Sequence, residues 1–307
     1  MISNHHYGMT LPLSNEIDKI KYRQTGEDFY SKIVRIAGSL KDTPQHFEEF
    51  KDTLRTMRFL PAGRVQNAMG ATRMTTAYNC FVSGTIEDDL SDILDKAKEA
   101  GLTMKKGGGI GYDFSNIRPR GDHIVSLDSK ASGPVSFMGI FDAVCQTIAS
   151  SGHRRGAQMG VLRIDHPDIM EFITAKSNAD QLTGFNVSVG VTDEFMRCLK
   201  EQRPFALVYK GKTYDEIDPV ALWDTIMRNT WDWAEPGVLF IDTINKMNNL
   251  WYCESIAATN PCGEQPLPPY GACLLGSFNL VKYVVDGQFD YGKLTGDIYN
   301  VVRAMDN

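Results

Sequence analysis

Long apolar runs are absent from the 307-residue sequence. No stretch of about 18 consecutive apolar residues could cross a bilayer, and the first residues lack the basic and apolar regions of a signal peptide. An excess of positive charge is also absent, since 32 Lys and Arg against 38 Asp and Glu give a net charge of −6. We therefore expect a cytoplasmic protein with no membrane span and no direct binding to nucleic acid.

Cysteine is scarce, with six residues and no CxxC pair. This spacing excludes a disulfide scaffold and a CxxC zinc site, and we assign no metal ligands. Cys145 and Cys198 stand in apolar stretches and are expected to be small buried hydrophobes. With 42% hydrophobic and 23% charged residues, the composition is that of a folded globular chain with one or two cores.

Two patterns of periodicity divide the chain. Residues 13–58 show helical spacing broken at Gly26 and at Thr43-Pro44, which predicts a small helical N-terminal region, residues 1–58. Residues 59–307 alternate glycines, short apolar runs and helical stretches, which is typical of one continuous α/β domain. Its clearest elements are helices after Asp89 and Asp218, a strand over 238–241 and a hairpin around 210–212.

The most informative segment is 259–273, where four prolines and two glycines predict a rigid loop. In extended chain alternate side chains share a face, so Asn260, Cys262 and Glu264 are expected to point the same way. An amide, a thiol and a carboxylate in one row suit a reaction that needs a sulfur reactant and a proton acceptor on a small substrate. A purely structural loop is the alternative.

Two other segments are rich in glycine. Residues 107–111 hold four glycines, which let backbone approach a ligand closely, but they follow a helix and so do not fit a dinucleotide fingerprint. A tight structural turn explains them equally well. In residues 151–160 two arginines lie between glycines, which suits phosphate or base contacts, and a solvated basic loop is the alternative.

Together these motifs resemble the large catalytic subunit of ribonucleotide reductases, most closely the adenosylcobalamin-dependent class. The matching segments are 59–64, 78–82, 107–118, 154–159, 182–189 and 260–280, and Asn-Pro-Cys-Gly-Glu at 260–264 is the most specific. The resemblance implies an α/β fold, half of the family's ten-stranded α/β barrel. About five mainly parallel strands are expected after the helical region, with a finger loop near residues 255–275.

The resemblance also implies roles for five residues. Cys262 matches the cysteine that becomes a transient thiyl radical and takes the 3′ hydrogen from the ribose. Glu264 matches the carboxylate that accepts the 3′-hydroxyl proton, and Asn260 matches the amide that hydrogen-bonds the sugar. Cys80 and Cys273 match the pair that supplies two electrons as the 2′-hydroxyl leaves as water, so their Cα atoms must come within about 7 Å.

Three sets of nucleotide contacts are implied in the same way. Substrate contacts are expected at Ala62, Asn79 and Gly109, although Asn79 stands where many relatives have Ser. A deoxynucleotide effector is expected at Asp88, Asp89 and Leu90, with Lys130 and Ser132 nearby. The expected specificity loop, which passes the effector's identity to the substrate site, consists of Arg154, Arg155, Gly156, Ala157, Gln158 and Met159.

The remaining expectations concern partners and cofactor. The chain stops where the family's barrel is half built, so we expect a second chain that carries the C-terminal half. This chain would then be one piece of a split reductase or a fragment, and we expect it to be inactive alone. About 58 residues precede the barrel motifs, too few for an ATP-binding domain that controls overall activity. We expect a ribonucleotide, as di- or triphosphate, to be the substrate.

The sequences of the matching motifs favour adenosylcobalamin (vitamin B12) as the radical source and a ribonucleoside-diphosphate reductase as the enzyme. A homodimer through the effector site is compatible with this resemblance. One alternative is a class I large subunit that takes its radical from a separate metal-containing subunit. The other is a nucleotide-binding subunit without chemistry of its own.

Overall fold

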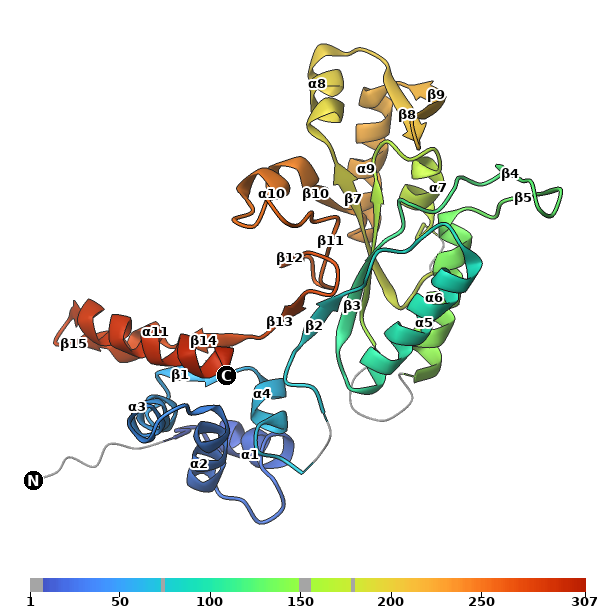
Figure 1. Cartoon of the computed structure of the whole chain (residues 1–307). Coiled ribbons are helices and arrows are strands. Elements are labelled where there is room, and N and C mark those ends of the chain that lie inside the picture. The colour runs from blue at the N-terminus through green and yellow to red at the C-terminus, as the bar shows by residue number, and fades with distance from the viewer. Residues whose placement is uncertain (1–7, 73–74, 149–155, 178–179) are drawn as a thin grey trace, which may run out of the picture. The chain divides into compact units, whose positions relative to one another are not determined.

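The computed structural model describes residues 8–72, 75–148, 156–177 and 180–307 (Figure 1). The helices are α1 (Pro12–Lys21), α2 (Phe29–Leu40), α3 (Pro44–Arg55), α4 (Gly63–Ala68), α5 (Leu90–Lys105), α6 (Pro134–Ile148), α7 (Ile169–Thr174), α8 (Asp193–Glu201), α9 (Pro219–Trp233), α10 (Ile241–Met247), the 3-10 helix η2 (Leu280–Tyr283) and α11 (Tyr291–Asp306). Within the described ranges, none of them has the length and apolar character needed to span a membrane.

The described strands have between two and seven residues. They are β1 (Phe59–Pro61), β2 (Cys80–Val82), β3 (Gly109–Asp113), β4 (His123–Ile124), β5 (Ser129–Lys130), β6 (Gln158–Arg163), β7 (Phe185–Val191), β8 (Phe205–Tyr209), β9 (Lys212–Ile217), β10 (Gly237–Phe240), β11 (Ala258–Thr259), β12 (Pro266–Leu267), β13 (Ala272–Cys273), β14 (Gly276–Phe278), β15 (Val284–Val285) and β16 (Gln288–Phe289).

The chain forms two compact units. Unit 1 comprises residues 1–79 and 274–307, and unit 2 comprises residues 80–273. Residues 59–79, which we predicted to open the barrel domain, therefore group with the helices of residues 1–58. The chain passes from one unit to the other twice, at 79–80 and at 273–274.

Unit 1 begins with the predicted helices. Gly26 lies between α1 and α2 with a φ of +78°, and Thr43 caps α3 by accepting a hydrogen bond from the His46 N–H. Helices α2, α3 and α11 share a core that includes Ile36, Phe50 and Val301. Strands β1 and β14 pair antiparallel, so the beginning and end of the chain fold as one unit.

A buried ionic network fixes α11 within unit 1. Asp297, which is 3% exposed, accepts hydrogen bonds from Arg58 Nε at 2.5 Å and from the Tyr283 hydroxyl at 2.9 Å. Burial opposes the charge of this carboxylate, but the Arg58 and Tyr283 hydrogen bonds prevail and hold the pKa of Asp297 below its usual value. The network thus depends on the ion pair between the Asp297 carboxylate and the Arg58 guanidinium.

Unit 2 is built on a six-stranded sheet in the order β10-β7-β6-β3-β2-β13. The first five strands are parallel, and β13 pairs antiparallel with β2. This confirms the α/β half-barrel with about five parallel strands. The antiparallel sixth strand is an addition that the sequence did not predict.

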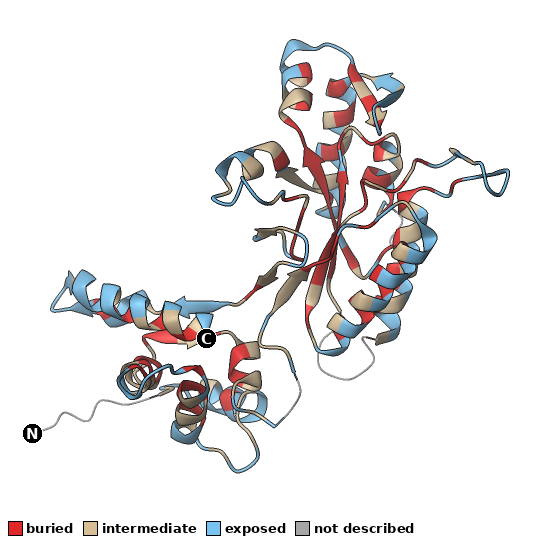
Figure 2. Cartoon of the chain, in the orientation of Figure 1, coloured by how far each residue is buried: buried red, intermediate tan, exposed pale blue. Residues whose placement is uncertain are grey.

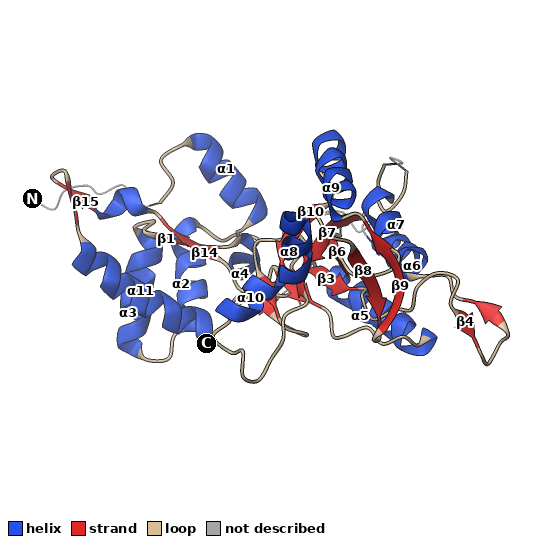
Figure 3. Cartoon of the chain, turned by 90° about the horizontal axis from the view of Figure 1, so that it is seen from above, coloured by secondary structure: helices blue, strands red, loops and turns tan. Residues whose placement is uncertain are grey.

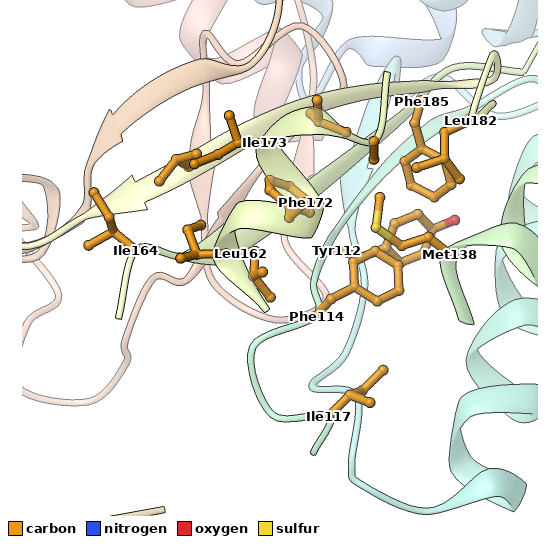
Figure 4. Close-up of a cluster of buried hydrophobic side chains, with 14 of the residues drawn as sticks. Tyr112, Phe114, Ile117, Met138, Leu162, Ile164, Phe172, Ile173, Leu182 and Phe185 are labelled. Atoms are coloured by element: carbon orange, nitrogen blue, oxygen red, sulfur yellow. The ribbon is translucent and has the colours of Figure 1, made fainter. Parts of the chain in front are cut away.

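One face of the sheet is apolar and packs against helices. Alternate residues of β3 and β7 enter the main core with Leu162 of β6, together with side chains of α5 to α9. Figure 4 shows part of this cluster, in which Tyr112, Phe114 and Phe185 lie close to Met138. Figure 2 shows how fully β6 and β7 are buried, and Figure 3 shows the helices around them. Cys145 and Cys198 are buried in this core, as expected.

Local signals place the other elements of unit 2. Asp89 caps α5 by accepting from the Ser91 and Asp92 N–H groups, and Asp218 caps α9 by accepting from the Val220 N–H. Strands β8 and β9 form the predicted hairpin, and β10 is the strand predicted over 238–241. The helix caps, the hairpin and this strand are confirmed, but the predicted burial of the strand is wrong, because β10 is an edge strand and its residues are half-buried or exposed.

Candidate active site

The second face of the sheet in unit 2 carries glycines, thiols and polar side chains. Neighbours in register point to the same side of a sheet, so the pairing of Cys273 with Cys80 and of Cys80 with Gly109 places these three positions on one face. The next row along the strands is Val82, Gly111, Met159 and Asn186. We call this surface the finger face.

A hairpin lies on the finger face (Figure 1). Strands β11 and β12 pair antiparallel, and residues 258–267, the finger hairpin, lie inside the expected finger-loop segment. Ala258 packs with Val82, Met159 and Val161 in a small apolar cluster between the hairpin and the sheet. The hairpin is therefore docked on the sheet through its strands.

The tip of the finger hairpin is a turn. The Gly263 N–H donates to the Asn260 carbonyl at 3.0 Å, the Asn260 N–H donates to the Gln265 carbonyl at 3.1 Å, and Gly263 has a φ of +79°. The expectation of an extended row is therefore wrong, because the chain reverses direction here. Asn260 is fully buried at the base of the turn, while Cys262 and Glu264 are exposed on it.

The side-chain amide of Asn260 is half satisfied. Its Oδ1 accepts from the Gln265 N–H at 3.0 Å, whereas its buried Nδ2 has no hydrogen-bond partner among the described residues. A buried donor without a partner costs roughly 1–3 kcal/mol. An acceptor on a ligand that reached this position would satisfy it.

The glycines of β3 make room for the finger hairpin. A Cβ at Gly111 would lie 1.8 Å from the Thr259 carbonyl oxygen, and one at Gly109 would lie 2.7 Å from Pro261 Cγ. The glycine stretch at 107–111 is thus explained in part by close packing of the protein on itself. It also puts Gly109 beside Pro261, the residue before Cys262.

Cys80 and Cys273 are direct cross-strand partners on β2 and β13. Such partners have Cα atoms about 4.5–5.5 Å apart, which is within the limit for a disulfide. Both are thiols in the structure. Burial raises the pKa of Cys273 to about 11, and the charges of Cys80 and Glu264 act in the same direction. The carboxylate on the hairpin tip is therefore close enough to influence the thiol on β13.

The loop that leads into β13 is fixed by Tyr270. Its hydroxyl accepts a hydrogen bond from Lys96 Nζ of α5 at 2.7 Å, and its backbone adopts a φ of +63°. A Cβ at Gly84 would lie 2.4 Å from the Tyr270 ring, so the ring lies directly against bare backbone. This contact was not predicted from the sequence.

The predicted substrate residues fall in both units. Gly109 lies on the finger face, whereas Ala62 and Asn79 belong to unit 1. Ala62 precedes α4 and its N–H donates to the Leu275 carbonyl, and the buried Asn79 Oδ1 has no hydrogen-bond partner among the described residues. Contact of Ala62 and Asn79 with a substrate stays a prediction.

The predicted effector residues surround the start of α5 and the β4–β5 hairpin. Asp88 accepts hydrogen bonds from the Arg118 N–H at 3.0 Å and from Arg118 Nε at 2.8 Å. Asp89 is the helix cap, and Leu90 is 57% exposed. Lys130, on β5, and Ser132, just after it, are also exposed. Our sequence reasoning missed Arg118, although it ends the matching segment 107–118.

The predicted specificity loop is only partly described. Arg154 and Arg155 lie outside the described residues, and Gly156 and Ala157 lead into β6. Gln158 and Met159 belong to strand β6 and not to a loop. Gln158 is buried and accepts a hydrogen bond from the Tyr112 hydroxyl at 2.9 Å, while Met159 lies on the finger face.

Comparison with known proteins identifies the class. Residues 78–307 match the profile of the family described as "Ribonucleotide reductase, barrel domain", and the chain belongs to this family.

Among its curated relatives, a vitamin B12-dependent ribonucleoside-diphosphate reductase of Thermoplasma acidophilum is 41% identical over 267 residues, which is 85% of this chain and 34% of that protein. A protein of the same name from Mycobacterium tuberculosis is 40% identical over 263 residues, which is 85% of this chain and 38% of that protein. The chain thus spans about a third of the length of these relatives.

A solved structure shares the fold. The class Id ribonucleotide reductase alpha subunit of Actinobacillus ureae superposes with a TM-score of 0.79 at 22% identity. The match covers 96% of this chain and 53% of that one.

Proposed function

We propose that this chain is the catalytic N-terminal part of a cytoplasmic ribonucleoside-diphosphate reductase, which makes deoxyribonucleotides by radical reduction of the ribose. The observation that carries the proposal is the arrangement on the finger face. The thiols of Cys80 and Cys273 are cross-strand partners, and the hairpin that bears Asn260, Cys262 and Glu264 is docked beside them. The names of the curated relatives support the same reaction.

Each residue has a role in this reaction. Cys262, as a thiyl radical, takes the 3′ hydrogen of the ribose, and Glu264 accepts the 3′-hydroxyl proton. The Asn260 Nδ2 group, buried and without a partner among the described residues, donates a hydrogen bond to the sugar. Cys80 and Cys273 supply two electrons and two protons as the 2′-hydroxyl leaves as water, and they end as a disulfide.

The high pKa of Cys273 suits this last step. With a pKa of about 11, its thiol carries a proton at neutral pH and can act as a proton donor. Burial is the main cause of this high pKa, and the charges of Cys80 and Glu264 act in the same direction.

We propose adenosylcobalamin as the radical source, because the relatives are named vitamin B12-dependent. When bound, it supplies the radical that oxidises the Cys262 thiol. The exposure of Cys262 on the turn fits an approach from outside the sheet. We propose that the residues that hold the cofactor lie largely on the rest of the reductase.

We further propose that a second chain carries the C-terminal half and that this chain is inactive without it. Among the described strands, β10 ends the sheet and offers its outer edge for pairing. We propose that a deoxynucleotide effector binds at Asp88 to Leu90 with Lys130 and Ser132. Leu90 and Leu94 are exposed on α5 and suit a homodimer at that site.

The test uses the complex of this chain with its partner chain, isolated by pull-down and supplied with adenosylcobalamin and ribonucleoside di- or triphosphates. C262S should abolish deoxyribonucleotide formation, and C253S is the matched control, since Cys253 is exposed and outside the finger hairpin. Turnover by C262S would exclude the proposed chemistry. Recovery of a metal-containing radical subunit would assign class I, and nucleotide binding without turnover would indicate a non-catalytic subunit.

A further inference from the structure

One side chain connects the sheet to the tip of the finger hairpin. Asn186 lies on β7, inside the segment 182–189 to which the sequence analysis assigned no role. Its register with Met159 places it on the finger face. Asn186 Nδ2 donates a hydrogen bond to the Pro261 carbonyl oxygen at 2.7 Å.

The bonded carbonyl belongs to the peptide that joins Pro261 to Cys262. Proline has no N–H, so the carbonyl is the one backbone hydrogen-bonding group that Pro261 can offer. On another side of Pro261, the lack of a side chain at Gly109 lets the proline ring lie closer to β3 than a Cβ would allow. Pro261 is buried between these contacts, and the next residue, Cys262, is exposed.

The internal bonds of the turn do not depend on Asn186. The Gly263 N–H and the Gln265 N–H both donate to Asn260, within the hairpin itself. Loss of the Asn186 bond therefore leaves the turn formed but removes the polar contact that fixes its tip against the sheet. Without the Asn186 hydrogen bond, the direction in which the Cys262 side chain leaves the turn is no longer fixed.

We propose that Asn186 is a positioning residue for Cys262, an inference that rests on the function proposed above. By holding the Pro261–Cys262 peptide from β7, Asn186 sets the position of the sulfur relative to Cys80 and Cys273 on the same face. A reaction that requires hydrogen transfer to one sulfur is sensitive to such placement, since a displacement of about 1 Å can cost roughly 100-fold in rate.

The decisive variant is N186D, which keeps the shape of the side chain but replaces the donor by an ionised acceptor facing a carbonyl. N229D is the matched control, because Asn229 on α9 undergoes the same change and contacts Ser177 and Thr225 instead of the finger hairpin. N186Q keeps a donor and tests for rescue. All variants are assayed in the complex with the partner chain.

We expect N186D to lower kcat by about 10- to 100-fold with KM changed less than about 2-fold, and N186Q to recover part of the loss. Hydrogen exchange should rise in residues 258–267 of N186D and stay as in the parent protein in N229D. Wild-type kcat or unchanged exchange in N186D would overturn the inference while leaving the proposed function intact. No turnover by the parent complex would overturn both.

Discussion

Replacing Gly111 by alanine tests whether the finger hairpin depends on bare backbone in β3. The new Cβ would lie 1.8 Å from the Thr259 carbonyl oxygen. Ordinary non-bonded contacts are about 3.5 Å, so the carbonyl would have to recede by roughly 1.7 Å. Gly111 has no positive φ, so the effect comes from this contact and not from backbone strain.

Thr259 cannot yield alone, because it and Asn260 are fully buried. The finger hairpin must move as a whole or the strand must distort, and overpacking of this kind costs about 1–3 kcal/mol of unfolding free energy. A displacement of that size also misplaces Cys262, with an expected loss of about 100-fold in turnover by the complex.

G190A is the matched control. Gly190 lies on the same sheet, on β7, and a Cβ there would meet its nearest atoms at 3.6–3.8 Å, which is ordinary contact. It should be neutral or stabilising by up to about 1 kcal/mol. Urea unfolding and hydrogen exchange of residues 258–267 measure the two variants side by side. Equal stability, with parent-like exchange in G111A, would refute the reasoning.

Two further predictions concern charge. Between pH 9 and 11 Cys273 is ionised in the unfolded chain but stays protonated in the folded chain, where its pKa is about 11. The free energy of unfolding should therefore fall by up to about 2–3 kcal/mol as the pH rises through this range. Urea unfolding of C273S should lack this pH-dependent loss. D297N should lower the unfolding free energy by about 1.5–3 kcal/mol, because it removes the buried, charged acceptor of Arg58 Nε and leaves Arg58 paired with Asp52 alone. E48Q, at an exposed ion pair with Lys51, should cost under about 1 kcal/mol, and an equal loss in both variants would contradict the argument.

Local signals explain which parts of the fold the sequence could predict. Thr43 and Asp218 are caps whose hydrogen bonds involve residues two or three positions away, so their pattern is visible in a few letters. The pairing of β13 with β2 has no such signal, because it joins residues from opposite ends of unit 2. The partnership of Cys80 and Cys273 came from resemblance and not from a local pattern.

The finger hairpin shows the limit of a local rule. Alternation along an extended chain predicted one row of side chains, but Gly263 allows the chain to turn between Cys262 and Glu264. A glycine after Asn-Pro-Cys is itself a turn signal, and weighing it would have corrected the prediction. The contact of Asn186 with Pro261 could not be foreseen, because nothing near either residue indicates which strand the hairpin covers.

The cross-strand thiols of Cys80 and Cys273 also stand at the first and the last positions of unit 2. A disulfide between them would close the whole unit into a covalent ring. By the chain-entropy relation, closing a loop of more than about 100 residues stabilises the folded state by roughly 5 kcal/mol. In the proposed reaction, each turnover would alternate unit 2 between a looser reduced form and a more strongly held oxidised form, so the resistance of unit 2 to unfolding would report its redox state.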